Sequence, residues 1–138
     1  MIENNQTWLL EKFDNRSDLI GLTTYPWKKF GDPGEIPEDY YARAAAHTTS
    51  PFAFTEIGWI SAESKGSSEA EQAGFLKRFT ALINGTNVGM VNWLFLHEVK
   101  IEGIAGKISE PETSTVALKY ANGTEKEVYS IWKELKNS

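Results

Sequence analysis

Three apolar runs at similar intervals constrain the fold of this chain more than any other feature of its sequence. They cover residues 19–25, 52–57 and 88–95, and Pro26, Gly58 and a polar stretch follow them. None of the runs alternates cleanly between polar and apolar residues, as a strand with one wet face would. Near-continuous apolar runs are typical of parallel strands that are buried on both faces. The pattern therefore predicts three buried parallel strands.

Helical patterns lie between and after these runs. The clearest begins at Ser68, which forms an S-x-x-E capping pattern with Glu71, and it ends at the Asn84-Gly85 pair. Further helices are predicted over residues 38–47 and 127–136, and residues 8–13 look like the end of another helix. Strands that alternate with helices imply a parallel sheet with crossover connections. The chain is therefore predicted to have an α/β fold.

The length of the chain limits how much of such a fold it can form. Its 138 residues suit one domain, residues 1–138, and not two. The closed parallel architecture, the (β/α)₈ or TIM barrel, takes about 250 residues, so the chain can supply only part of one. If the chain belongs to such a barrel, we expect a partial barrel of about three parallel strands with flanking helices.

Charge and composition exclude several classes of partner. The formal net charge is −5, whereas proteins that bind nucleic acid need a basic face. The chain has no cysteine, and none of its apolar runs approaches the ~20 residues that cross a bilayer. Residues 1–13 do not have the pattern of a signal peptide, so a secreted or periplasmic parent enzyme would carry its signal upstream. The compartment is left open.

Glu56 is the residue that most needs an explanation. It lies at the carboxyl end of a strand predicted to be buried on both faces, where a carboxylate is costly unless it is paired or solvated in a cleft. The carboxyl ends of parallel strands form the active-site face of α/β barrels. Tyr25 and Trp93 end the other two predicted strands, so one carboxylate would share a cleft with two aromatic rings. The alternative is a carboxylate that forms a salt bridge at the rim, beside aromatic residues that belong to the core.

These residues carry a resemblance to a known family. Residues 18–27, 51–59 and 91–93 resemble the sixth, seventh and eighth strands of clan A retaining glycoside hydrolases, such as endo-galactanase-like and cellulase-like enzymes. Residues 118–133 are similar to the turn and last helix that close many of these barrels, although Glu127-Val128 stands where a proline is common. The resemblance covers nearly the whole chain, from Asp18 to Leu135.

The resemblance implies a role for each strand end. Glu56 would be the nucleophile that attacks the anomeric carbon, and Tyr25 would hydrogen-bond to it. Trp93 would form the floor of the subsite that holds the reacting sugar. Trp59 and Trp27 would be further sugar platforms. The implied reaction is hydrolysis of O-glycosidic bonds in a polysaccharide or oligosaccharide, with a carbohydrate substrate and no cofactor.

One part of the family pattern is missing. The acid/base of these enzymes is a glutamate that follows an asparagine at the end of the fourth strand, which would lie upstream of Met1. His97-Glu98 follows the third apolar run but does not match that position. Retaining hydrolysis needs two carboxyl groups about 5–5.5 Å apart. We therefore expect the chain to be inactive alone.

Two alternatives remain open from the sequence. The first is a non-catalytic carbohydrate-binding or interaction protein derived from such a barrel. The second is an unrelated three-stranded α/β domain with an aromatic core. His97 is a candidate substrate contact near the cleft, although the sequence favours a histidine at the rim. His47 and His97 lie too far apart in the sequence, without a carboxylate at ligand spacing, to predict a metal site.

A partial barrel would leave two sheet edges and its inner face uncovered. We expect that inner face to be apolar, and exposed edges of this kind invite pairing with another chain. The sequence therefore predicts a homo-oligomer that covers the exposed barrel face, with edge pairing as one way to form it.

Overall fold

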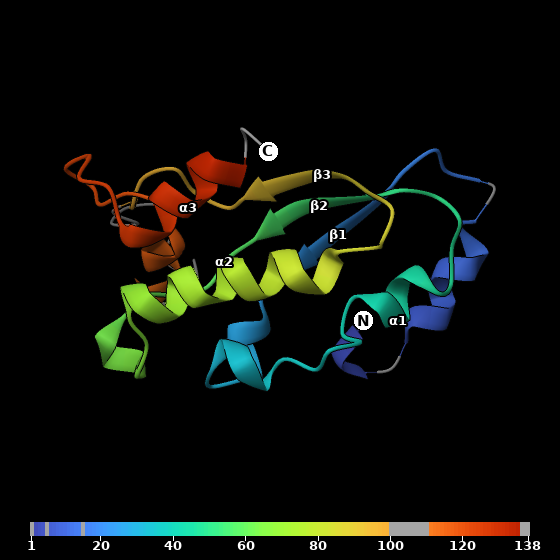
Figure 1. The fold of residues 1–138 in the computed structure, drawn as a ribbon, viewed down its shortest axis with the longest axis horizontal. Coiled ribbons are helices and arrows are strands. Elements are labelled where there is room, and N and C mark those ends of the chain that lie inside the picture. Colours follow the sequence, from blue (N-terminus) through green and yellow to red (C-terminus); the bar gives the residue numbers. More distant parts are fainter. Residues whose placement is uncertain (1, 5, 15, 100–110, 136–138) are drawn as a thin grey trace.

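The computed structural model describes residues 2–4, 6–14, 16–99 and 111–135. Within them the chain forms an α/β fold with one open sheet (Figure 1). The strands and α-helices follow in the order β1 (Ile20–Thr24), α1 (Ala42–Ala45), β2 (Phe52–Ile57), α2 (Glu69–Ile83), β3 (Val88–Trp93) and α3 (Glu127–Leu135). Short 3₁₀ turns connect them.

The sheet is entirely parallel, with the strand order β1-β2-β3, as the alternation of strands and helices predicted. The strands begin in one row, because Phe52 pairs with Ile20 on one side and with Val88 on the other. The central strand β2 is paired on both sides, whereas β1 and β3 are each paired on one side only. Within the part of the chain that the structure describes, the outer edges of β1 and β3 therefore have no paired strand.

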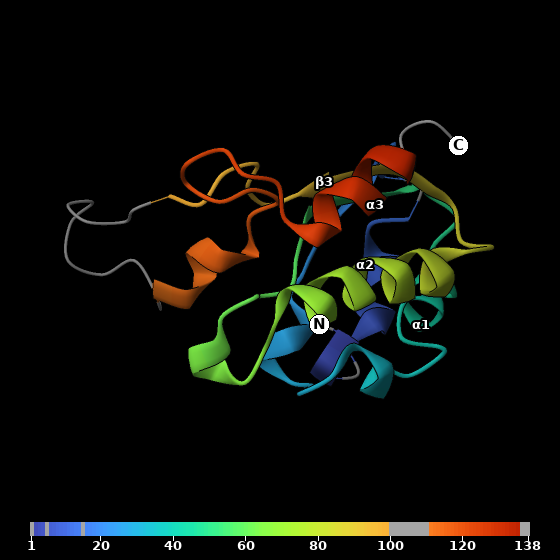
Figure 2. The same ribbon diagram turned by 60° about the vertical axis from the view of Figure 1, so that its left-hand side comes forward.

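One face of the sheet carries the core. Phe54 of β2 packs edge to face against Phe79 of α2 and Tyr41, with ring centroids 5.0 and 5.2 Å apart. In β1, Ile20, Leu22 and Thr24 are buried on the same side, while the residues between them are exposed. Helices α2 and α3 contact each other and cover this face, as Figure 2 shows. We call it the covered face.

The opposite face is open and polar. Gly21 and Thr23 of β1, Thr55 of β2 and Asn92 of β3 are all exposed. The apolar inner face expected of a partial barrel stays a prediction, and the exposed Met90 lies on the open face in one row with Gly21. Most large apolar side chains of the strands turn to the covered face, which leaves small and polar residues on the other. We call this second surface the open face.

Helix α2 matches its prediction closely. The hydroxyl oxygen of Ser68 accepts a hydrogen bond from the backbone N–H of Glu71 at 3.2 Å, which satisfies a free amide in the first turn. Gly85 follows the C-cap residue with φ of +80°, a left-handed conformation that glycine adopts without strain.

The helix predicted over residues 127–136 is confirmed as α3 over the described residues, whereas the two remaining helical predictions need correction. The helix predicted over residues 38–47 is only α1, four residues long, because tertiary anchors on both sides set the path of the chain. On one side Tyr40 and Tyr41 are both buried, and on the other Thr48 and Thr49 donate to the Asp14 carboxylate. The segment predicted as a helix end forms a 3₁₀ turn, Thr7–Lys12.

The third strand is shorter than its apolar run. It ends at Trp93, and the carbonyl of Phe95 then accepts a hydrogen bond from the backbone N–H of Leu118. The segment after β3 therefore pairs with the stretch that leads into α3 and leaves the sheet.

Two buried polar side chains fasten this returning stretch to the core. The amide nitrogen of Gln72, in α2, donates to the carbonyl oxygens of Trp59 and Val116, both at 2.8 Å. The ammonium group of the fully buried Lys126 lies 2.7 Å from the Glu98 carboxylate and also donates to Ser61. Buried charges are tolerated when they are paired in this way. Among the described residues no helix is both long and apolar enough to cross a membrane.

Candidate active site

A β-bulge turns the Glu56 side chain to the open face. The pairing of β1 with β2 shifts between Leu22 and Thr23, so Leu22 pairs with Phe54 and Thr23 pairs with Glu56. Thr55 is the extra residue. Strict alternation after Phe54 would turn Glu56 into the aromatic core, whereas the bulge gives that place to the fully buried Ile57. Bulges of this kind are enriched next to active sites, where they redirect a side chain.

Tyr25 holds the redirected carboxylate. Its hydroxyl donates to Glu56 Oε2 at 2.6 Å, the short distance expected when the acceptor is charged. Burial raises the pKa of Tyr25 above its ordinary value, and the hydrogen bond and charge of Glu56 raise it further. The phenol therefore remains a proton donor to Glu56 throughout the physiological pH range. The sequence predicted that these two residues share one end of the sheet, and the structure brings them into contact.

Three further polar residues line up beside Glu56. The hydroxyls of Thr23 and Thr55 lie 3.2 Å apart, and Thr55 also donates to the carbonyl of Leu22. The amide of Asn92 donates to the carbonyl of Thr55 at 3.0 Å, which ties β3 to the bulge. Sequence reasoning missed all three. Their position in the sequence could have indicated them. Each lies one or two residues before a strand-end residue that the sequence analysis named as a candidate.

Lys28 brings positive charge to the same end of the sheet. Its ammonium group lies 5.6 Å from the ring centroid of Tyr25 and 5.5 Å from that of Trp27. Cations within about 6 Å of an aromatic ring are attracted to its face. Trp27 itself is half-buried in the 3₁₀ turn directly after β1. Of the tryptophans proposed as sugar platforms, Trp27 lies nearest along the chain to Tyr25.

The other two tryptophans lie on the covered face. Trp93 is 4% exposed, and its indole N–H donates to the carbonyl of Val116 at 2.6 Å. Trp59 is 1% exposed and stacks on Phe75 with ring centroids 5.4 Å apart. Neither ring presents a free face to solvent. The structure therefore gives both a packing role in this chain and separates them from Glu56.

His97 is exposed and lies away from the strand ends. It forms a bridge with Lys119, and its ring comes within 4.0 Å of the position of a Cβ on Gly123. Its neighbours thus belong to the tail that closes the fold, not to Tyr25 or Glu56. Among the described residues no cluster of His, Asp and Glu is arranged to hold a metal ion.

The candidate site is an open surface at the strand ends with one carboxylate among the described strand-end residues. Of the strand-end residues that the structure describes, Glu56 alone has a carboxyl side chain. Two hollows of about 680 and 520 Å³ involve α2 and β3, and Glu56 lines neither of them. The arrangement provides a fixed, partly exposed carboxylate with a neutral proton donor beside it. Such a carboxylate can bind or attack an electron-poor carbon, but it has no second acid within the described strand ends to protonate a leaving group.

Comparison with known proteins adds no assignment. The sequence matches no model of a known protein family and no curated protein. Any statement about function therefore rests on the residues themselves.

Proposed function

We propose that this chain supplies the last three βα units of a clan A retaining glycoside hydrolase barrel, with Glu56 as the nucleophile. The observation that carries the proposal is the 2.6 Å hydrogen bond from Tyr25 to Glu56 at the carboxyl ends of parallel strands. The fold supports it as well, because barrel strands are parallel and have helices on one side only. The open face of the sheet would then be part of the barrel interior.

The proposed chemistry uses the carboxylate directly. Glu56 attacks the anomeric carbon of a β-linked sugar, a C–O bond forms to its oxygen, and the glycosidic oxygen leaves with the bonding electron pair. Tyr25 holds the carboxylate through Oε2. No hydrogen bond from another described residue to Oε1 is seen, so Oε1 would be the attacking oxygen. Trp27 is the proposed sugar platform. The contributions to sugar binding inferred for Trp59, Trp93 and His97 from the resemblance have less support, because two are buried and one lies elsewhere.

The chain alone should not hydrolyse ordinary glycosides. A sugar or alcohol leaving group must be protonated as it departs, and a second carboxyl about 5–5.5 Å from the nucleophile does this in retaining enzymes. The strand ends described here contribute one carboxylate. Hydrolysis therefore requires an acid from outside these three units.

A substrate that needs no acid tests the nucleophile by itself. Dinitrophenyl 2-deoxy-2-fluoro-β-glycosides lose a stable dinitrophenolate without protonation, and they trap the glycosyl-enzyme as an ester. With a panel of gluco-, galacto- and manno-configured reagents, we expect at least one to release dinitrophenolate and leave one sugar on the protein. Mass spectrometry of peptides should place the added mass on Glu56.

Two variants make this test specific. Glu56→Gln should abolish labelling, whereas Glu63→Gln, at an exposed glutamate in a 3₁₀ turn, should leave it unchanged. Tyr25→Phe should slow labelling without moving its site. Labelling of another residue, or equal labelling of Glu56→Gln, would contradict the assignment of the nucleophile.

The alternative is a carbohydrate-binding protein without catalysis. The single carboxylate at the described strand ends is the observation that favours it. In that case oligosaccharides should bind to the wild-type chain and to Glu56→Gln with affinities within about threefold, and no reagent should label either protein. Titration calorimetry with galactan, glucan and mannan oligosaccharides distinguishes this outcome from the first.

A further inference from the structure

The two outer edges of the sheet differ in their surfaces. On the β1 edge the surface has a hollow of about 230 Å³, lined by residues that include Phe13, Leu19 and Gly21. On the β3 edge the side chain of Met90 is 48% exposed. We propose that copies of this chain associate head to tail, with the free edge of β3 in one copy paired in parallel to the free edge of β1 in the next.

The register of the sheet places these two features opposite each other. Ala53 of β2 pairs with Gly21 on one side and with Met90 on the other, so Gly21 and Met90 belong to one row. A second copy that continues this row would set its Gly21 beside Met90 of the first. Gly21 lines the hollow of the β1 edge and has no side chain to block the approach. The Met90 side chain is unbranched and adaptable, and it would enter that hollow.

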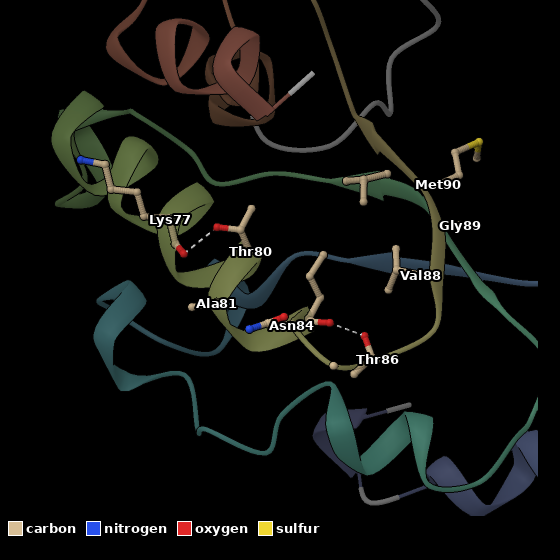
Figure 3. Close-up of a pocket in the computed structure, with 11 residues that line it drawn as sticks. Lys77, Thr80, Ala81, Asn84, Thr86, Val88, Gly89 and Met90 are labelled. Atoms are coloured by element: carbon tan, nitrogen blue, oxygen red, sulfur yellow. Dashed lines mark hydrogen bonds between the residues drawn. The ribbon is translucent and has the colours of Figure 1, made fainter. Parts of the chain in front are cut away.

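In the same interface, side chains of the β1 edge would also enter a hollow at the β3 edge. Phe13 and Leu19 are 54% and 46% exposed at the β1 edge, which is unusual for large apolar residues beside a strand. The β3 edge offers a hollow of about 680 Å³ between the end of α2 and β3 (Figure 3). Figure 3 shows Ala81 of α2 and Val88 of β3 on its walls, so apolar groups meet the incoming side chains.

Charge and backbone also favour this pairing over others. Lys77 lines the hollow at the β3 edge, and the exposed Asp18 directly precedes Leu19 at the β1 edge, so opposite charges would approach. Unpaired strand edges present free backbone donors and acceptors, and charged edge residues or prolines that usually block such pairing are absent from β1 and β3. A second copy is the natural occupant, because both halves of the fit belong to one chain.

The predicted association covers edges and not the open face. Away from Met90, the face that carries Thr23, Thr55 and Asn92 is polar, so it gives a second copy little apolar area to bury beyond the edges. Two Glu56 residues in adjacent copies would be three strands apart, about 14 Å at the usual strand spacing. Pairing therefore does not bring two carboxyls to the ~5–5.5 Å of a retaining site. The inference concerns this chain by itself and does not use the proposed glycosidase chemistry, because in a complete barrel neighbouring strands would occupy both edges.

Charged substitutions on each edge test the inference. We expect the wild-type chain to form dimers or larger species at micromolar concentration in sedimentation velocity. Met90→Lys blocks the β3 edge and Leu19→Lys blocks the β1 edge, so each variant alone should sediment as a monomer. Leu96→Lys is the matched control, because Leu96 is 51% exposed but lies outside both edges. Circular dichroism spectra and thermal unfolding check that all the variants are folded.

A mixture of the two blocked variants gives the sharpest result. Met90→Lys retains its β1 edge and Leu19→Lys retains its β3 edge, so the mixture should form a heterodimer and nothing larger. A symmetric β3–β3 interface would instead let Leu19→Lys dimerise alone, and a β1–β1 interface would let Met90→Lys do so. Either of those results would overturn the proposal, as would a monomeric wild type or a mixture that remains monomeric.

Discussion

The two faces of the three-stranded sheet are built from the same strands but follow different rules. The covered face holds Phe54, Ile57 and Trp93 in contact with helices, and each is at most 4% exposed. The open face holds Thr23 and Thr55, whose hydroxyls are hydrogen-bonded to each other, and Glu56, which accepts a hydrogen bond from Tyr25. Solvent reaches all three side chains. On the covered face, packing sets the orientation of the side chains. On the open face, hydrogen bonds and a bulge set it.

The two faces have separate roles: the covered face stabilises the fold, and the open face carries the candidate site. Burial of aromatic side chains is the dominant favourable term in folding, and here it belongs almost entirely to the covered face. The open face contributes few buried apolar groups, and it is free to carry a partly exposed carboxylate. Substitutions on the two faces should therefore have different consequences, and the following predictions test this in order of expected effect.

Phe54→Ala should produce the largest loss of stability. The Phe54 ring is 1% exposed and contacts the rings of Tyr41 and Phe79, so truncation leaves a cavity at the centre of the aromatic core. We expect the free energy of unfolding to fall by about 3–5 kcal/mol in urea denaturation. Thr55→Ala, at the next residue on the other face, should lower it by less than about 1 kcal/mol. A similar loss for both would show that the two faces do not differ as described.

Gly58→Ala should produce an intermediate loss through crowding. A Cβ at Gly58 would lie 2.2 Å from Cγ1 of the buried Val116, so one of the two must move. Overpacking of this kind typically lowers stability by about 1–3 kcal/mol. Val116→Ala in the same chain should restore part of the loss, because it removes the clashing methyl group. A double-mutant cycle measures this coupling, and purely additive effects would contradict the proposed contact.

The sequence predicted the covered side of the fold better than the site. Three parallel strands and α2 were predicted correctly, because long apolar runs and a capping pattern are local signals. The facing of Glu56 was not predictable, since the bulge at Thr55 shifts the alternation of β2 by one residue. Nothing in Thr55 itself marks it as the extra residue. The bulge follows from the pairing of β2 with both neighbours, which is a tertiary property.

The hydrogen bond between Tyr25 and Glu56 should make the stability of the protein depend on pH in the alkaline range. Tyr25→Phe removes one hydrogen bond at a half-exposed site, so it should lower stability by about 0.5–1.5 kcal/mol near neutral pH. The pKa of Tyr25 is raised by folding, so its contribution is fully present below the unfolded value of about 10. It is lost as the pH rises above about 10, toward the higher pKa of the folded state.

Urea denaturation of both proteins at neutral pH and at about pH 11 measures this difference. The gap between wild type and Tyr25→Phe should narrow at the higher pH. Tyr120→Phe gives a comparison at a different carboxylate. The hydrogen bond to Glu69 raises the pKa of Tyr120 to about 12, so the gap between wild type and this variant should narrow as well. A gap between wild type and Tyr25→Phe that stays constant would mean that Tyr25 does not donate to Glu56 in solution.

The smallest effects come from the most closely matched pair, the neighbours Thr23 and Thr24. Thr24 is buried on the covered face with its hydroxyl 3.3 Å from that of Tyr41, whereas Thr23 is exposed on the open face. Thr24→Val should lower the free energy of unfolding by about 1 kcal/mol, because it removes a buried hydrogen bond. Thr23→Val should change it by less than about 0.5 kcal/mol, since its hydroxyl can be replaced by water. The same substitution at adjacent residues thus isolates the face of the sheet as the variable, and equal effects would remove the distinction on which the site assignment depends.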